Sequence, residues 1–176
     1  IVIPSTSGTG SEVTWATVST DSEAETKLSL GSREDQADIA IVDPCFVVDL
    51  PPQLVADTGV DALTHAIEGY TSTWRNGFSD GLALKAIQMI FQYLPLSYET
   101  GDPQEREKMH NAACMAGLAF GNSQAALAHA MGHSLGATFH VPHGRAVGLY
   151  LPYTIEFTSG YEEGRYADIA RVLVLN

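Results

Sequence analysis

The chain has 176 residues and a formal net charge of −12; 45% of its residues are hydrophobic and 17% are charged. This composition is typical of a globular protein and excludes a disordered chain. The negative charge argues against a nucleic-acid partner, because phosphates need a surface rich in Lys and Arg. No uncharged apolar run is long enough to span a bilayer, so we expect no membrane association. The two cysteines lie in unlike segments, which predicts a reducing, cytoplasmic environment without a disulfide framework.

The first 50 residues have strand and turn character. Short apolar or alternating runs predict strands over residues 1–3, 13–20, 27–30 and 37–43. Between the first two runs, residues 5–11 read Ser-Thr-Ser-Gly-Thr-Gly-Ser. Such a loop either brings backbone N–H groups and hydroxyls close to a phosphate or ribose, or is an ordinary turn. It lacks the third glycine of the dinucleotide fingerprint, because position 13 is Val, so both interpretations stay open.

From residue 51 onward the apolar side chains follow helical spacing. Pro51 and Pro52 are placed as at the start of a helix, where a missing N–H donor is tolerated. The pattern predicts a mostly α-helical fold with helices over residues 55–71, 79–93, 104–118, 125–137, 145–158 and 161–173, the fifth of which Pro152 could kink.

Both ends resemble parts of a longer protein. Ile1-Val2-Ile3 is a strand-like run with nothing before it, and residues 171–176 are apolar almost to the last position. Apolar surface left exposed at such ends favours association, so we expect a homo-oligomer.

Histidines gather in one stretch of the sequence and suggest a metal site. His129 and His133 are four residues apart on a predicted helix and therefore share one face, as do Asp61 and His65 on another helix. His143 lies in a Pro-His-Gly turn that can direct its imidazole back towards the first pair. A carboxylate with several imidazoles suits Fe(II) or Zn(II) better than Mg or Ca. Because no thiolate is nearby, a catalytic site is favoured over a structural zinc site.

Other candidate residues have plainer interpretations. A zincin protease is excluded because position 130, where the general-base Glu would stand, is Ala. His110 stands alone and is expected to be solvated or to cap a helix. Glu68 lies one turn after His65 and could support it, although a solvated position is the commoner case. Phe120 and Phe139 are expected in the core or in a pocket wall. The two cysteines have no base nearby in the sequence, so nucleophilic catalysis has no support.

Three motifs in combination resemble the iron-containing (group III) alcohol dehydrogenases. They are PSTSGTGSEVT (residues 4–14), TGVDALTHAIEGY (residues 58–70) and HAMGHSLG followed by PHG (residues 129–136 and 142–144). Members of that family are about twice as long, as expected for two domains, with an α/β nucleotide domain first and further helices at the end. The resemblance implies that residues 1–50 are the C-terminal remnant of that α/β cofactor-binding domain. It also implies that residues 51–176 form an all-helical metal-binding and catalytic domain that is incomplete at its C-terminus.

The resemblance also implies roles for single residues. His133 would lie near the nicotinamide and relay a proton, and Phe120 would form a wall of the substrate pocket. The metal, Fe(II) or Zn(II), would be bound by Asp61, His65, His129 and His143. The nicotinamide and ribose side of NAD(P) would be lined by Ser5, Thr6, Thr9, Val18 and Lys27.

The implied activity is a metal-dependent, NAD(P)-linked alcohol dehydrogenase or aldehyde reductase acting on a small-molecule alcohol or aldehyde. The metal would act as a Lewis acid on the alcohol oxygen while hydride passes to the nicotinamide. Two other classes stay open. One is a helical metal-binding module without dehydrogenase activity. The other is a metal-dependent hydrolase, for which no general base is evident in the sequence.

Overall fold

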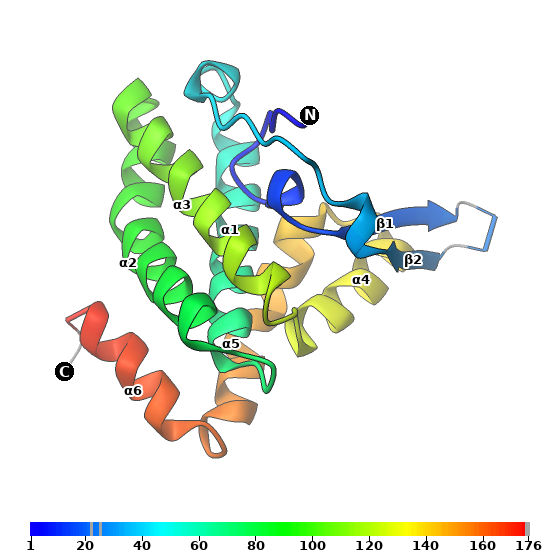
Figure 1. Cartoon of the computed structure of the whole chain (residues 1–176), viewed down its shortest axis with the longest axis vertical. Coiled ribbons are helices and arrows are strands. Elements are labelled where there is room, and N and C mark those ends of the chain that lie inside the picture. Colours follow the sequence, from blue (N-terminus) through cyan, green and yellow to red (C-terminus); the bar gives the residue numbers. More distant parts are fainter. Residues whose placement is uncertain (22, 25, 175–176) are drawn as a thin grey trace.

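The computed structural model describes residues 1–21, 23–24 and 26–174, without the side chains of residues 20, 27 and 29. In this part of the chain, a body of helices carries one projecting β-hairpin (Figure 1). The helices are α1 (Pro52–Thr71), α2 (Gly77–Thr100), α3 (Pro103–Gly121), α4 (Leu127–Phe139), α5 (His143–Ser159) and α6 (Glu163–Val172). The mostly α-helical fold expected from the sequence is thus confirmed. No helix among the described residues has the length and apolar character that crossing a membrane requires.

The hairpin pairs β1 (Ala16–Asp21) with β2 (Thr26–Gly31) in antiparallel register, with Ala16 opposite Gly31. The strands predicted over residues 1–3 and 37–43 do not form as strands. These runs meet only in a parallel bridge between Val2 and Ala40, where the amide of Val2 donates to the carbonyl oxygen of Ile39. Pro4 and Pro44 bound the runs and cannot donate ladder hydrogen bonds, which limits their pairing.

Two helices continue through proline. α2 passes through Pro95 and reaches Thr100, beyond the predicted end at residue 93, and α5 contains Pro152. Local capping defines other boundaries. The Asn76 side chain accepts hydrogen bonds from the amides of Phe78 and Ser79 at the start of α2. Neither Pro95 nor Pro152 ends its helix, because tertiary packing outweighs the one hydrogen bond that each proline removes.

α1 is the central helix of the body and contacts each of the other five (Figure 1). Small side chains on α1 allow close packing: Ala62 and Ala66 are fully buried, and a Cβ at Gly59 would lie 2.3 Å from Leu94 of α2. The largest fully buried apolar side chains around it are Ile87 and Ile90 of α2 and Met109 of α3. Because α1 is enclosed on most sides, some of its polar residues are also buried, among them Asp61 and Thr64.

Two glycines allow the Ser/Gly loop (residues 5–11) to pack closely between α1 and α3. A Cβ at Gly8 would lie 2.6 Å from Thr58 Cβ, and one at Gly10 would lie 2.5 Å from Gly117 Cα. Gly10 also has φ of +62°, which favours glycine. Close packing onto two helices therefore accounts for both glycines without a phosphate.

His110 is not the solvated or helix-capping residue that its isolation in the sequence predicted. It lies in the interior of α3, only 2% of it is exposed, and its Nδ1 is 3.1 Å from the hydroxyl oxygen of Ser7. This contact ties the Ser/Gly loop to α3. The interpretation failed because the partner lies 103 residues away in the sequence.

The buried His110 is expected to make stability depend on pH. Burial lowers the pKa of His110 below its ordinary value of 6.5, although the nearby Asp43 carboxylate opposes this. The unfolded chain therefore takes up the proton first. The contribution of neutral His110 to stability is fully present above about pH 6.5. As the pH falls from there through the folded-state pKa, the free energy of unfolding decreases by no more than about 1.4 kcal/mol per pH unit.

The test is the free energy of unfolding by urea, with EDTA present, at about pH 7.5 and about pH 5.5. His110→Gln should lose less stability between these pH values than the wild type, because glutamine does not titrate. Equal losses in the two proteins would contradict the effect.

Candidate metal centre

One face of α1 carries three buried ionisable residues. Asp61, His65 and Glu68 follow a spacing of four and then three residues, which places them on the same side of the helix. Asp61 is completely buried, and His65 and Glu68 are almost so. Such polar groups are costly inside a protein unless they bind partners, so this face is a candidate site.

α4 and α5 bring two further histidines to this face. His129 is buried on α4, and α4 packs closely on α5 because Gly132 faces Val147: a Cβ at Gly132 would lie 2.6 Å from Val147 Cγ1. His143 is the first residue of α5, directly after Pro142. The pair of helices thus directs two imidazoles towards α1.

Close backbone contact fixes the start of α5 against α1. A Cβ at Gly144 would lie 1.9 Å from the carbonyl oxygen of Asp57, so only glycine fits here. Next to it, Arg145 donates from Nε and Nη2 to the two carboxylate oxygens of Asp57 at 3.1 and 3.0 Å. These contacts hold His143 with its Nε2 3.4 Å from Asp61 Oδ1.

The clustered atoms fit a divalent transition metal. One candidate ligand atom each from Asp61, His65 and His129 lies within 4.8 Å of the other two, and His129 Nε2 is 3.5 Å from Asp61 Oδ1. Among the residues that the structure describes, the Asp61 oxygens and His129 Nε2 make no hydrogen bond despite their burial. One carboxylate and three imidazoles, counting His143, are ligands that Fe(II) and Zn(II) accept.

The electrostatics of the cluster favour a cation. Burial would raise the pKa of Asp61, but the neighbouring imidazoles of His65, His143 and His129 lower it to about 2. Burial lowers the pKa of His65 to about 4, so its ring is neutral, as a metal ligand must be. Burial also disfavours the charged form of His129, yet the carboxylates of Asp61 and Glu68 raise its pKa to about 9. Against the effect of burial, His129 also lowers the pKa of Glu68, so both carboxylates that face this histidine are anionic. A bound metal ion would displace the proton from His129 Nε2.

Glu68 is not on a solvated face, which was the commoner case expected for it. It is only 5% exposed, and its Oε2 lies 2.5 Å from Nδ1 of His129. The sequence held a signal for this position, because Glu68 is seven residues after Asp61 and therefore lies on the same face of α1.

A cavity of about 430 Å³ opens beside the cluster. Phe120 lines it and stacks on His65 with ring centroids 4.1 Å apart. His133 lines it too, with its ring 5.1 Å from that of His143 and 6.2 Å from that of His129. Phe120, the predicted pocket wall, and His133, the predicted proton relay, therefore both line the same cavity.

The structure brings only some of the predicted cofactor contacts to this cavity. Thr9 and Val18 line it, whereas Ser5 and Thr6 are not among its described lining residues. Lys27 belongs to β2, but its side chain lies outside the described part of the chain. The sequence interpretation missed further lining residues: Ser11, Thr14, Ala16 and Ala125. Strand alternation could have found Ala16, which is two residues before Val18 on β1.

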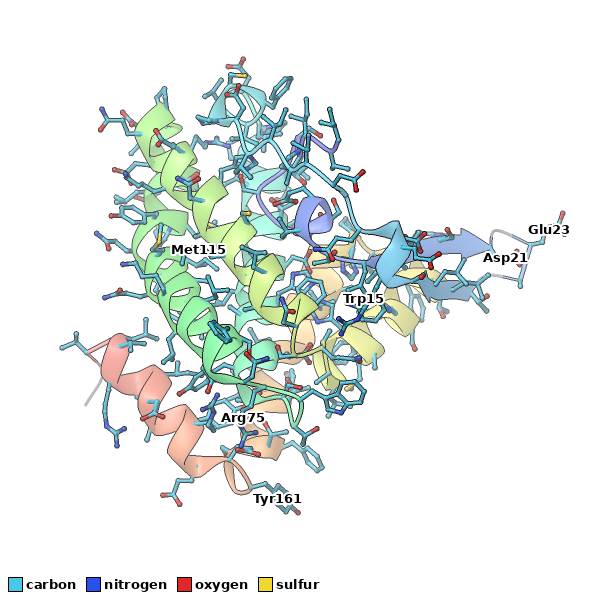
Figure 2. The ribbon with its side chains drawn as sticks, viewed as in Figure 1. Trp15, Asp21, Glu23, Arg75, Met115 and Tyr161 are labelled. Carbon is cyan, nitrogen blue, oxygen red and sulfur yellow. The ribbon has the colours of Figure 1, made fainter. Side chains whose placement is uncertain are left out.

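A smaller cavity of about 260 Å³ adjoins the first and shares His129 and His133 with it. Trp15 lines this second cavity at the base of the hairpin, where the hairpin meets the helical body (Figure 2). Its indole Nε1 donates to the carbonyl oxygen of Gly121 at 3.0 Å, which ties the hairpin to the end of α3.

Comparisons with known proteins agree on one family. A family model described as iron-containing alcohol dehydrogenase matches residues 1–44, and one described as the C-terminal part of the Fe-containing alcohol dehydrogenase family matches residues 55–176. An NADPH-dependent butanol dehydrogenase of Clostridium saccharobutylicum is 49% identical over 175 residues, which are 99% of this chain and 45% of that protein. A 1-propanol dehydrogenase of Salmonella typhimurium is 47% identical, over 97% of this chain and 47% of the relative.

Solved structures show the same relationship. The iron-containing alcohol dehydrogenase of Thermococcus thioreducens has a TM-score of 0.91 at 41% identity, covering 99% of this chain and 46% of that one. A sulfoacetaldehyde reductase of Bifidobacterium kashiwanohense in complex with NAD+ has a TM-score of 0.91 at 36% identity, covering 97% and 46%. The chain spans about half the length of these relatives. It belongs to the iron-containing alcohol dehydrogenase family.

Proposed function

We propose that this chain supplies the metal-binding part of an active site that interconverts small alcohols and aldehydes with NAD(P). The observation that carries the proposal is the convergence of Asp61, His65, His129 and His143 beside a cavity. Relatives named as butanol and 1-propanol dehydrogenases support a small alcohol as the substrate.

The proposed ion is Fe(II) or Zn(II), held by those four residues. When bound, it would act as a Lewis acid on the substrate oxygen. The nicotinamide would exchange hydride with the reacting carbon. Thr9 and Val18, which line the cavity, are the best-supported contacts for that ring, and Ser5, Thr6 and Lys27 remain proposed contacts for the rest of the cofactor.

Two further side chains have proposed roles that follow from their positions. His133 lines the cavity and is half-buried, so it can pass the hydroxyl proton from the substrate towards water. Phe120 presents an apolar face to the same space and, through its stack on His65, restrains the ring of that ligand. An apolar wall also keeps water away from the reacting carbon.

A metal-dependent hydrolase would need a free general base beside the cluster. The nearby buried carboxylate of Glu68 accepts hydrogen bonds from two amides and from His129, so most of its acceptor positions are occupied. A hydrolase would therefore have to use His133 as its base, and the names of the relatives favour the dehydrogenase.

The test is NAD(P)-linked oxidation of 1-propanol and 1-butanol by the chain after anaerobic loading with Fe(II) or Zn(II). We expect metal-dependent turnover at high concentrations of NAD+ or NADP+, and none in Asp61→Asn. Stoichiometric metal binding without turnover under either cofactor would instead support a metal-holding module.

A further inference from the structure

α4 begins without a capping side chain of its own. Its N-cap residue is Ala126, which has no side-chain acceptor for the free amides of the first turn. Glu68 of α1 provides that acceptor from another helix. Its Oε2 accepts from the amide of Ala126 at 2.9 Å, and its Oε1 accepts from the amide of Ala128 at 2.6 Å. A carboxylate at this end of a helix is also favoured by the helix dipole.

The same carboxylate reaches the metal-binding histidine of α4. Glu68 Oε2 lies 2.5 Å from His129 Nδ1, while Nε2 of that ring is 3.5 Å from Asp61 Oδ1. A carboxylate can only accept, so Nδ1 carries the proton and donates it. Nε2 is then the nitrogen presented to Asp61 and to a metal.

We propose that Glu68 is a positioning residue that couples the start of α4 to the orientation of the metal ligand His129. One side chain fixes both where α4 begins on α1 and which imidazole nitrogen faces the cluster. The inference rests on the proposed metal role of this site. Its physical basis is that the helix start and the histidine are only one turn apart and share one acceptor group.

The first experiment replaces Glu68 by Gln and measures Zn(II) affinity by competition with a chromophoric chelator. Glutamine keeps one acceptor oxygen instead of two, so in either orientation of its amide the NH₂ group faces N–H donors that the carboxylate accepts: Ala128 on one side, or Ala126 and His129 Nδ1 on the other. We expect zinc affinity to fall about 10- to 100-fold, as for other supporting residues of metal-bound histidines. Glu156→Gln removes the same charge from an exposed site on α5 and should leave the affinity unchanged.

A second measurement needs no variant and therefore does not depend on whether Glu68→Gln folds. Long-range ¹H–¹⁵N NMR spectra of the zinc-loaded wild type report which nitrogen of His129 carries a proton. We expect the proton on Nδ1 and the metal on Nε2. The reverse arrangement would overturn the proposal.

The outcomes separate this inference from the proposed function. If zinc binds and depends on Asp61 but no alcohol is oxidised, the dehydrogenase proposal fails while the role of Glu68 can still hold. If turnover is observed and a folded Glu68→Gln binds zinc within about twofold of the wild type, the role of Glu68 is wrong and the dehydrogenase stands.

Discussion

Gly144→Ala is expected to destabilise the chain by about 3 kcal/mol or more and to abolish stoichiometric zinc binding. The added Cβ would lie 1.9 Å from the carbonyl oxygen of Asp57, a backbone atom that cannot turn aside as a side chain could. Relief requires α5 to move away from α1, and His143 moves with it because it is the preceding residue. Urea unfolding and zinc titration measure the two effects.

Gly81→Ala is the matched control for this substitution. Gly81 also lies in a helix, but a Cβ there would meet nothing within 4 Å. Alanine should stabilise α2 by about 0.5–1 kcal/mol and leave zinc binding intact. If Gly144→Ala keeps its stability and its zinc binding as this control does, α5 does not approach α1 as closely as described.

Asp61→Asn is expected to weaken Zn(II) binding at least about 100-fold, which corresponds to about 3 kcal/mol. The amide keeps the shape of the side chain but removes the only anionic group among the four proposed ligands. The carboxylate is fully buried beside three imidazoles, and these hold its pKa at about 2, so it is anionic across the physiological range. Competition with a chelator measures the affinity, and circular dichroism checks that the helices remain.

Asp38→Asn makes the same chemical change at an exposed position in the loop before η3 (Pro44–Phe46). It should bind zinc as the wild type does. If Asp61→Asn retains wild-type affinity, Asp61 is not a ligand and the cluster must bind cations, if at all, through the histidines alone.

Local patterns predicted much of this structure. Apolar spacing located the helices, because each of them buries one face against the body. Spacing of four residues placed Asp61 beside His65, since such pairs share a helix face whatever the surrounding fold. The strands predicted over residues 13–20 and 27–30 correspond to β1 and β2, and in the turn after β1 Asp21 accepts hydrogen bonds from the amides of Glu23 and Ala24.

Features that depend on distant partners could not be predicted in this way. The burial of His110 depends on Ser7, and the role of Glu68 depends on amides of α4. The residues that neighbour His110 and Glu68 in the sequence do not indicate either contact. α2 runs through Pro95 for the same reason, because packing of the whole helix outweighs a local breaking signal. The division of the chain at residues 50 and 51 into parts of two domains remains a prediction.

Metal content per chain, measured after anaerobic loading with Fe(II) or Zn(II), tests the central claim most directly. The wild type should hold about one ion, His129→Ala should lose it, and His140→Asn should keep it. His140 is the suitable control because it is exposed and has φ of 55°, a conformation that asparagine tolerates. An ion retained by His129→Ala, or no ion in the wild type, would contradict a metal centre built from Asp61, His65, His129 and His143.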